Sequence, residues 1–274
     1  MTGFVDTHAH LQEPEFADDV DDVIRRARDS GVKTLVLPAV DLASARSGLE
    51  LARRHDGVYA TAGYHPHEAS KLDMDSLTEI EVLLDDELIV AVGEIGLDFY
   101  RMHSPVDAQV AALDAMLTLA ERHTMPIVVH CRDAWEATAD QLEPWARRVA
   151  PAFGERPVGV LHYFTGTMDE AQRYIELGFM ISIHTSVTRP RQQPLRDVVA
   201  RLPLESLVIE TDAPYGAPQS HRGKRNEPAY VVEVAKQIAV LHDVDLDYIG
   251  EVTSANARRL FGLPVMADAT GGHG

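Results

Sequence analysis

The stretch Gly3-Phe4-Val5-Asp6-Thr7-His8-Ala9-His10-Leu11 is a short apolar run followed at once by polar residues. In a strand, residues two apart point to the same face, so the imidazoles of His8 and His10 converge. Two imidazoles on a rigid strand end are typical of a site for zinc or a related transition metal. The segment therefore predicts a strand whose C-terminal end presents metal ligands.

The same arrangement recurs along the chain, where apolar runs are followed by histidines or carboxylates. These residues are His65 after 58–63, Glu94 after 89–93, His130 after 127–129, His162 after 158–161, and Glu210 and Asp212 after 207–209. A fold that collects the C-terminal ends of its strands at one mouth would bring all of them into one pocket. The pattern indicates a metal-dependent hydrolase.

Apolar runs alternate with helical stretches throughout the chain. We expect strands at 3–7, 33–38, 58–63, 88–93, 126–130, 158–162, 179–183 and 207–210. We expect helices at 15–30, 42–55, 73–86, 105–123, 133–149, 167–177, 194–201 and 228–242, and a ninth, packed on the outside, at 245–261. Eight alternating units predict a parallel sheet, and only a closed ring brings ligands from such distant units together. We therefore predict an α/β fold, a (β/α)8 TIM barrel with an additional C-terminal helix. A doubly wound open sheet is the alternative.

The length of 274 residues fits one large barrel or two average domains. The sequence has no internal repeat and no linker. We expect a single metal-dependent hydrolase barrel over residues 1–264 and a disordered tail over residues 265–274.

The charge balance is strongly acidic, with 25 basic and 43 acidic residues and a net charge of −18. Such a surface repels nucleic acid at long range and disfavours nonspecific binding to duplexes. It does not exclude a phosphodiester substrate, because site metals and a local basic patch act where the global field does not.

The densest basic run, residues 221–225, follows the last expected strand. We expect its Arg222, Lys224 and Arg225, together with Arg132, to bind substrate phosphate, because arginine offers paired donors to an anion. A solvated loop is the alternative.

The chain has a single cysteine, Cys131, and no apolar run near the roughly 20 residues of a membrane span. The first residues enter a strand without a basic region or an apolar signal core. We expect a cytoplasmic protein that does not engage a membrane, and we infer no obligate protein partner.

Seven motifs, taken together and in this order, resemble the TatD-type deoxyribonucleases of the metal-dependent amidohydrolase superfamily. They lie at 6–11, 63–67, 93–100, 129–134, 161–166, 210–215 and 221–228, and the resemblance runs from residue 4 to about residue 262. It implies a (β/α)8 barrel with two divalent ions. Tyr163, the segment 183–185 and the segment 218–220 depart from the family pattern, which leaves substrate preference open.

The resemblance also implies roles for individual residues. One ion would be held by His8, His10, Glu94 and Asp212, and the second by Glu94, His130 and His162. Glu94 would bridge the two. Glu210 and His65 match positions that the family uses near the reaction centre.

We expect hydrolysis of phosphodiester bonds in single-stranded DNA or at oligonucleotide ends through a metal-activated water, with Asp212 as the proton acceptor. The cofactors would be two divalent ions, which could be zinc, manganese, cobalt or magnesium. One alternative is an amide or ester hydrolase of the same superfamily, including one that deacylates mischarged aminoacyl-tRNA. Another is a metal-binding scaffold without catalysis.

Overall fold

Eight parallel strands form the centre of the computed structural model, which describes residues 3–264; the tail expected at 265–274 lies outside the described residues. Each strand pairs with the next in chain order. The strands are β1 (Phe4–Asp6), β2 (Val32–Leu37), β3 (Val58–Ala62), β4 (Ile89–Asp98), β5 (Ile127–Arg132), β6 (Gly159–Leu161), β7 (Phe179–His184) and β8 (Leu207–Glu210). The eight expected strands are confirmed, with ends that shift by a few residues.

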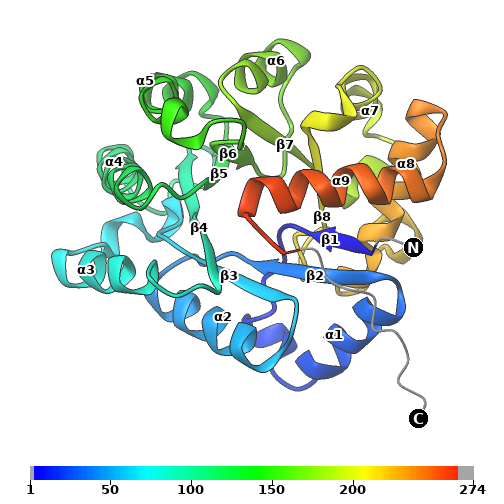
Figure 1. Cartoon of the computed structure of the whole chain (residues 1–274), viewed down its shortest axis with the longest axis horizontal. Coiled ribbons are helices and arrows are strands. Elements are labelled where there is room, and N and C mark those ends of the chain that lie inside the picture. Colours follow the sequence, from blue (N-terminus) through cyan, green and yellow to red (C-terminus); the bar gives the residue numbers. More distant parts are fainter. Residues whose placement is uncertain (1–2, 265–274) are drawn as a thin grey trace.

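The first and last strands meet and bring the sheet close to a closed barrel. The backbone N–H of Thr7 donates to the carbonyl of Ile209 at 3.1 Å. Just beyond the strand ends, Ala9 and Ala213 form an isolated parallel bridge. The expected α/β TIM barrel is therefore confirmed, and the open sheet is not formed (Figure 1).

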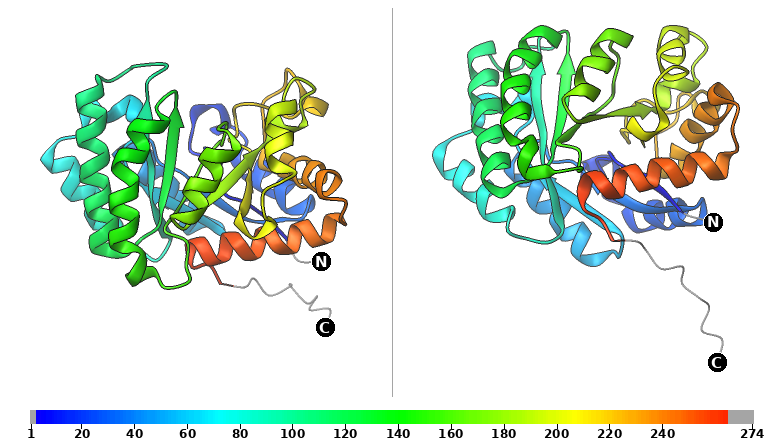
Figure 2. Two further views of the ribbon diagram at one scale, coloured as in Figure 1. Left: turned by 90° about the horizontal axis from the view of Figure 1, so that it is seen from above. Right: turned by 45° about the horizontal axis from the view of Figure 1, so that its top comes forward.

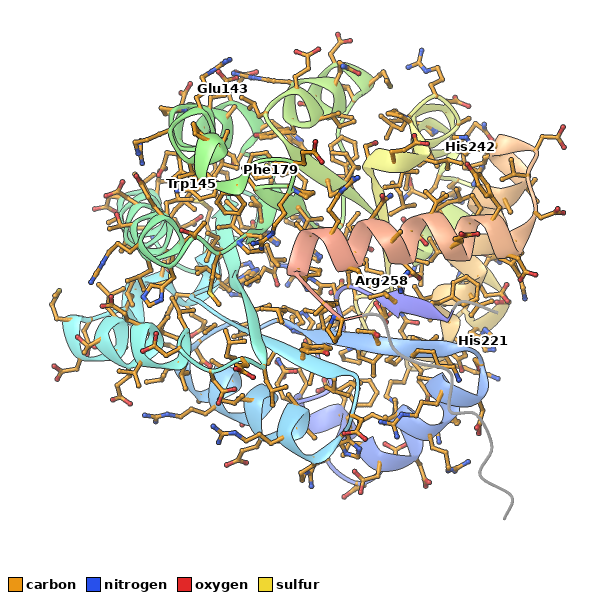
Figure 3. The ribbon with its side chains drawn as sticks, in the orientation of Figure 1. Glu143, Trp145, Phe179, His221, His242 and Arg258 are labelled. Atoms are coloured by element: carbon orange, nitrogen blue, oxygen red, sulfur yellow. The ribbon has the colours of Figure 1, made fainter. Side chains whose placement is uncertain are left out.

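Helices surround this ring (Figure 1). They are α1 (Val20–Asp29), α2 (Leu42–Arg54), α3 (Met74–Leu83), α4 (Val106–His123), α5 (Trp135–Phe153), α6 (Met168–Glu176), α7 (Gln193–Val199), α8 (Val231–His242) and α9 (Leu246–Phe261). Helix α1 begins later than the expected residue 15, because Pro14–Phe16 forms a separate 3-10 turn. Figure 3 shows one contact between the helices and the barrel: Trp145 of α5 lies beside Phe179 of β7, and the centroids of the two aromatic rings are 6.5 Å apart.

Strand β4 runs five residues beyond the end expected from the sequence. Its pairing with β5 shifts register between Gly93 and Ile95, and the N–H of Glu94 donates to the carbonyl of Ala39 at 2.7 Å. Such an irregularity re-aims one side chain without ending the strand. Further along, Gly96 has a φ of +143°, and a Cβ there would overlap the carbonyl of His130. Only glycine allows the two strands to stay paired at this point.

Helix α9 lies across one end of the barrel and does not stand in the outer ring (Figure 2, left). The side chain of Ser254 donates to the carbonyl of Gly3, and that of Asn256 to the carbonyl of Leu207, so α9 covers the amino-terminal ends of β1 and β8. Its apolar residues join the inward-facing side chains of the strands in one buried cluster, which includes Val5, Val36, Val128, Val160, Val208, Ala257, Leu260 and Phe261. The opposite, carboxyl-terminal end of the barrel is thereby left for a pocket.

Within residues 3–264, no helix is both long enough and apolar enough to span a bilayer.

Leu260 tests this arrangement, because its side chain is fully buried at the barrel end. We expect Leu260→Ala to lower the free energy of unfolding by about 2–5 kcal/mol, as for a fully buried leucine that leaves a cavity. Chemical denaturation measures this loss. The matched control is Val240→Ala, whose side chain is 75% exposed. A loss in the Leu260 variant no larger than in the control would show that α9 does not belong to the core.

Candidate metal centre

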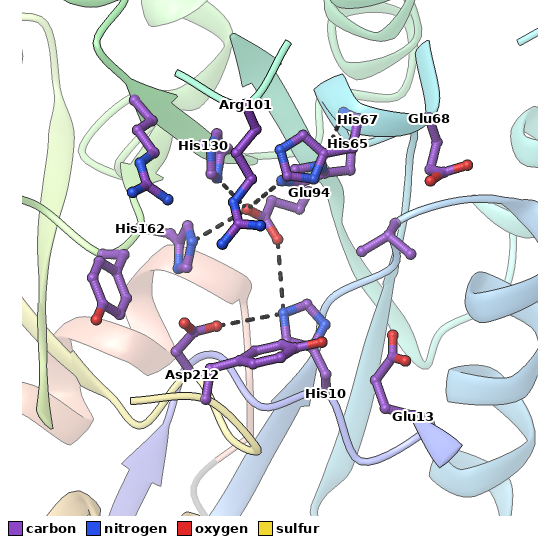
Figure 4. A pocket seen from close by; sticks show the side chains of 14 residues that line it. His10, Glu13, His65, His67, Glu68, Glu94, Arg101, His130, His162 and Asp212 are labelled. Atoms are coloured by element: carbon purple, nitrogen blue, oxygen red, sulfur yellow. Dashed lines mark hydrogen bonds and ion pairs between the residues drawn. The ribbon is translucent and has the colours of Figure 1, made fainter. Parts of the chain in front are cut away.

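A pocket of about 480 Å³ lies at the carboxyl-terminal end of the barrel (Figure 4). Its lining includes His10, Glu13, His65, His67, Glu68, Glu94, Arg101, His130, Arg132, His162, Tyr163, Asp212 and Tyr215. These residues lie in the carboxyl-terminal parts of six different strands or in the loops that follow them, as the alternation of apolar runs and polar residues predicts.

The carboxylate of Glu94 lies at the centre of this pocket and is only 2% exposed. Five imidazoles surround it. The distances from its oxygens are 2.9 Å to His130 Nδ1, 3.2 Å to His162 Nε2, 3.3 Å to His8 Nε2, 3.4 Å to His65 Nε2 and 3.9 Å to His10 Nε2. Burial alone would raise the pKa of Glu94, but the surrounding imidazoles hold it well below its usual range. The site is therefore built around a buried negative charge.

A second carboxylate, Asp212, completes one side of the cluster. Its Oδ1 lies 3.5 Å from His10 Nε2 and 3.8 Å from His8 Nε2, and these two nitrogens lie 3.2 Å from each other. Asp212 has a left-handed backbone with a φ of +58°, which is uncommon outside glycine and recurs at functional sites. Its side chain points into the pocket (Figure 4).

The spacing of these atoms fits divalent metal ions. Imidazole nitrogens and carboxylate oxygens are the ligands that zinc-like ions prefer, and a tetrahedral shell places neighbouring ligand atoms about 3.3 Å apart. Three groups of residues in the described part of the chain bring ligand atoms within 4.8 Å of one another: His8, Glu94 and His162; His8, His10 and Asp212; and His65, Glu94 and His130. The structure thus brings together all six expected metal ligands, and their coordination of an ion stays a prediction.

Glu210 lies behind this cluster, outside the pocket lining. Its carboxylate accepts hydrogen bonds from His162 Nδ1 at 3.1 Å, the Tyr163 N–H at 2.7 Å and the Ser182 hydroxyl at 2.6 Å. Burial would raise the pKa of Glu210, but the neighbouring His162 and these bonds lower it to about 2. A carboxylate so enclosed and so acidic orients His162, with Nε2 toward Glu94, and is poorly placed for the catalytic role expected from the sequence.

Asp98 orients His130 in the way that Glu210 orients His162, and the sequence alone leaves Asp98 open between a positioning residue and a turn residue. Its Oδ2 lies 3.2 Å from His130 Nε2 and 2.8 Å from His67 Nε2, so that His130 Nδ1 faces Glu94. The signal that could have identified Asp98 is its position at the far end of the same strand as Glu94.

His65 faces the pocket with a defined tautomer. The backbone N–H of His67 donates to His65 Nδ1 at 3.1 Å, so this nitrogen carries a lone pair and Nε2 carries the proton. Burial lowers the pKa of His65 to about 4, which keeps the ring neutral. The Nε2–H of His65 therefore faces Glu94 Oε1, 3.4 Å away, and a part for His65 in a reaction stays a prediction.

Two arginines line the pocket. Arg132, expected from the sequence, lies over the Tyr100 ring at 4.0 Å. Arg101, which sequence reasoning missed, lies three residues beyond the end of β4, and its backbone N–H donates to Asp98 at 2.7 Å. Neither guanidinium pairs with a carboxylate of residues 3–264, which leaves both cations available to a bound anion.

The three cations expected to clamp phosphate from the basic loop, Arg222, Lys224 and Arg225, are not among the residues that line this pocket. Arg225 pairs with Asp19 at 2.7 Å and with Glu227 at 3.1 Å. Its charge is thus neutralised by carboxylates of this chain. Sequence proximity to the last strand did not reveal these partners.

Comparisons with known proteins agree with this geometry. A family model described as TatD related DNase matches residues 5–262. The chain is 37% identical over 265 residues to the 3'-5' ssDNA/RNA exonuclease TatD of Edwardsiella piscicida, covering 94% of this chain and 99% of that protein. It is 36% identical over 256 residues to the uncharacterized metal-dependent hydrolase YabD of Bacillus subtilis, covering 93% and 98%. The crystal structure of YJJV, a TatD homolog from Escherichia coli K12, is similar with a TM-score of 0.87 and 33% identity, covering 95% and 98% of the two chains.

Glu210→Gln tests whether this carboxylate orients a metal ligand. We expect metal affinity to fall by about 10- to 100-fold, because the amide weakens the hold on His162. Calorimetric titration of metal-free protein with Mn²⁺ or Zn²⁺ measures the change. The control is Glu205→Gln, which alters an exposed carboxylate just before the same strand. A folded Glu210 variant with unchanged affinity would contradict the orienting role.

Proposed function

We propose that this chain, which belongs to the TatD related DNase family of metal-dependent hydrolases, removes nucleotides from the ends of single-stranded DNA or oligonucleotides. The observation that carries the proposal is the buried Glu94 among five imidazoles, with Asp212 beside it and two arginines that pair with no carboxylate of residues 3–264. The relatives named as 3'-5' ssDNA/RNA exonucleases support the choice of substrate.

We propose two divalent ions, the first held by His8, His10, Glu94 and Asp212 and the second by Glu94, His130 and His162. When bound, such ions make a water molecule acidic enough to act as a nucleophile and stabilise charge on the phosphoryl oxygens. The number of imidazoles favours zinc, manganese or cobalt over magnesium.

Asp212 is the proposed proton acceptor. Its side chain is 15% exposed and borders the pocket, and its Oδ2 has no hydrogen bond to any residue between 3 and 264. A water oriented for attack on phosphorus can donate its proton to this oxygen. We propose that His65 Nε2–H donates to a phosphate oxygen and that Arg101 and Arg132 supply charged donors to the same group; the tautomer of His65 and the presence of all three in the pocket lining support this.

The size of the pocket supports a strand end as the substrate. A volume of about 480 Å³ is in the range of small-molecule sites, which suits one nucleotide and not a duplex.

We further propose that residues 1–264 act as a single hydrolase barrel. A cytoplasmic location stays a prediction.

Asp212→Asn tests the proton acceptor. We expect the hydrolysis rate of a single-stranded oligonucleotide to fall by about 100-fold or more, because an amide cannot accept the proton. Oligonucleotide binding, measured by fluorescence anisotropy, is expected to persist. Asp197→Asn is the control, since it makes the same change at an exposed helix position. A near-normal rate would assign the proton to another group, and loss of metal in step with rate would assign Asp212 to ligation alone.

Substitution of single arginines separates the pocket cations from the basic loop. We expect Arg101→Ala and Arg132→Ala each to raise KM by about tenfold or more, the effect of a lost hydrogen bond to a charged group. Arg222→Ala is expected to leave KM within about twofold, as for a surface substitution. Steady-state kinetics on one oligonucleotide compares them. A large effect confined to Arg222 would return phosphate binding to the loop, and turnover of acyl esters in place of phosphodiesters would favour the ester hydrolase.

A further inference from the structure

The pocket carries opposite charges on its two sides. Arg101 follows β4 and Arg132 is the last residue of β5, whereas Glu13 follows β1 and Glu68 lies in the 3-10 turn Pro66–Lys71 after β3. Figure 4 shows Glu13 and Glu68 on one side of the imidazole cluster and Arg101 reaching over Glu94 toward His162. A bound strand therefore meets attraction on one side of the reaction centre and repulsion on the other.

The two acidic side chains differ in how they are compensated. Glu68 pairs with Lys71, an exposed residue. The carboxylate of Glu13 has no ion pair or hydrogen bond with any residue in the range 3–264, although it is half-buried. The N–H of Glu13 donates to the carbonyl of His10 at 3.1 Å, which holds Glu13 directly beside the cluster. An uncompensated carboxylate at a pocket wall selects among substrate groups by charge.

A nucleic-acid strand presents a regular series of negative charges. When one phosphate lies at Asp212 and the two arginines, the strand that continues over the arginine side is attracted. The nucleoside on the other side brings its terminal group toward Glu13. A hydroxyl there donates a hydrogen bond to the carboxylate, whereas a phosphate, with a charge near −2, is repelled.

We propose that Glu13 is a specificity-determining residue that makes the pocket accept a strand end bearing a free hydroxyl and reject one bearing a phosphate. The inference rests on the proposed function and deepens it. It also accounts for action at ends, because a cut inside a strand would place the next phosphodiester beside Glu13.

The test uses single-stranded oligonucleotides of one sequence that end in a 3'-hydroxyl or a 3'-phosphate, with a second pair that differs at the 5' end. We expect the unmodified protein, loaded with Mn²⁺, to hydrolyse the hydroxyl-ended strand about tenfold faster, the scale of one partly screened charge repulsion. Glu13→Gln is expected to bring the ratio close to one by accelerating the phosphate-ended strand. Glu13→Lys is expected to reverse the preference.

Equilibrium binding provides a readout without turnover. Fluorescence anisotropy of the same oligonucleotides with metal-free protein is expected to show the same order of preference and the same response to Glu13→Gln. The matched control is Glu251→Gln, which removes one exposed carboxylate on α9 at the opposite end of the barrel. The control separates the local effect of Glu13 from the net charge of the whole protein.

The outcomes are distinct. Discrimination at either end that the Glu13 variants abolish or reverse, with the Glu251 variant unchanged, supports the proposal. A ratio near one in the unmodified protein, or a ratio that persists in both Glu13 variants, overturns it and leaves the proposed function intact. Failure to hydrolyse any of the oligonucleotides refutes the proposed function, and the inference with it.

Discussion

The burial of the Glu94 carboxylate is the constraint on which the rest of this site depends. A charge that is 2% exposed is unfavourable unless other groups compensate it. The chain compensates it with imidazoles from four other strand ends, and two of these imidazoles are in turn oriented by Asp98 and Glu210. The imidazoles that face Glu94 are thus held in place by a second set of carboxylates behind them, and their nitrogen atoms point toward one position.

The barrel makes this convergence possible because one of its ends is covered by a helix and the other end holds the pocket. Helix α9 covers the amino-terminal end and packs against inward-facing valines of the strands. The carboxyl-terminal end stays open, and the loops there carry the polar residues. A rigid, apolar interior below the site keeps the ligands at fixed spacing, which a metal centre needs.

The basic side chains of this acidic protein differ in whether they are paired with carboxylates. A chain of net charge −18 repels nucleic acid at a distance, yet Arg101 and Arg132 line the pocket without an ion pair to any carboxylate in the described part of the chain. The basic loop after β8 has a structural part instead, because Arg225 and Arg26 bind Asp19 and Glu227 and join that loop to α1. Local pairing, and not the density of positive residues, decides which cations remain for a substrate.

The sequence by itself determined the eight strands, the barrel and the six candidate ligands that the structure brings together, since a strand period of two and the position of a polar residue after an apolar run are local properties. It predicted β4 too short, because the irregularity at Glu94 depends on pairing with β5. Only the tertiary structure decided that Glu210 turns behind His162, that Arg101 enters the pocket and that Arg225 is neutralised. Each of these outcomes depends on partners supplied by other elements, as when Asp19 meets Arg225 from 206 residues away. Such pairings leave no period or spacing in the chain, and only the closed barrel brings the partners together.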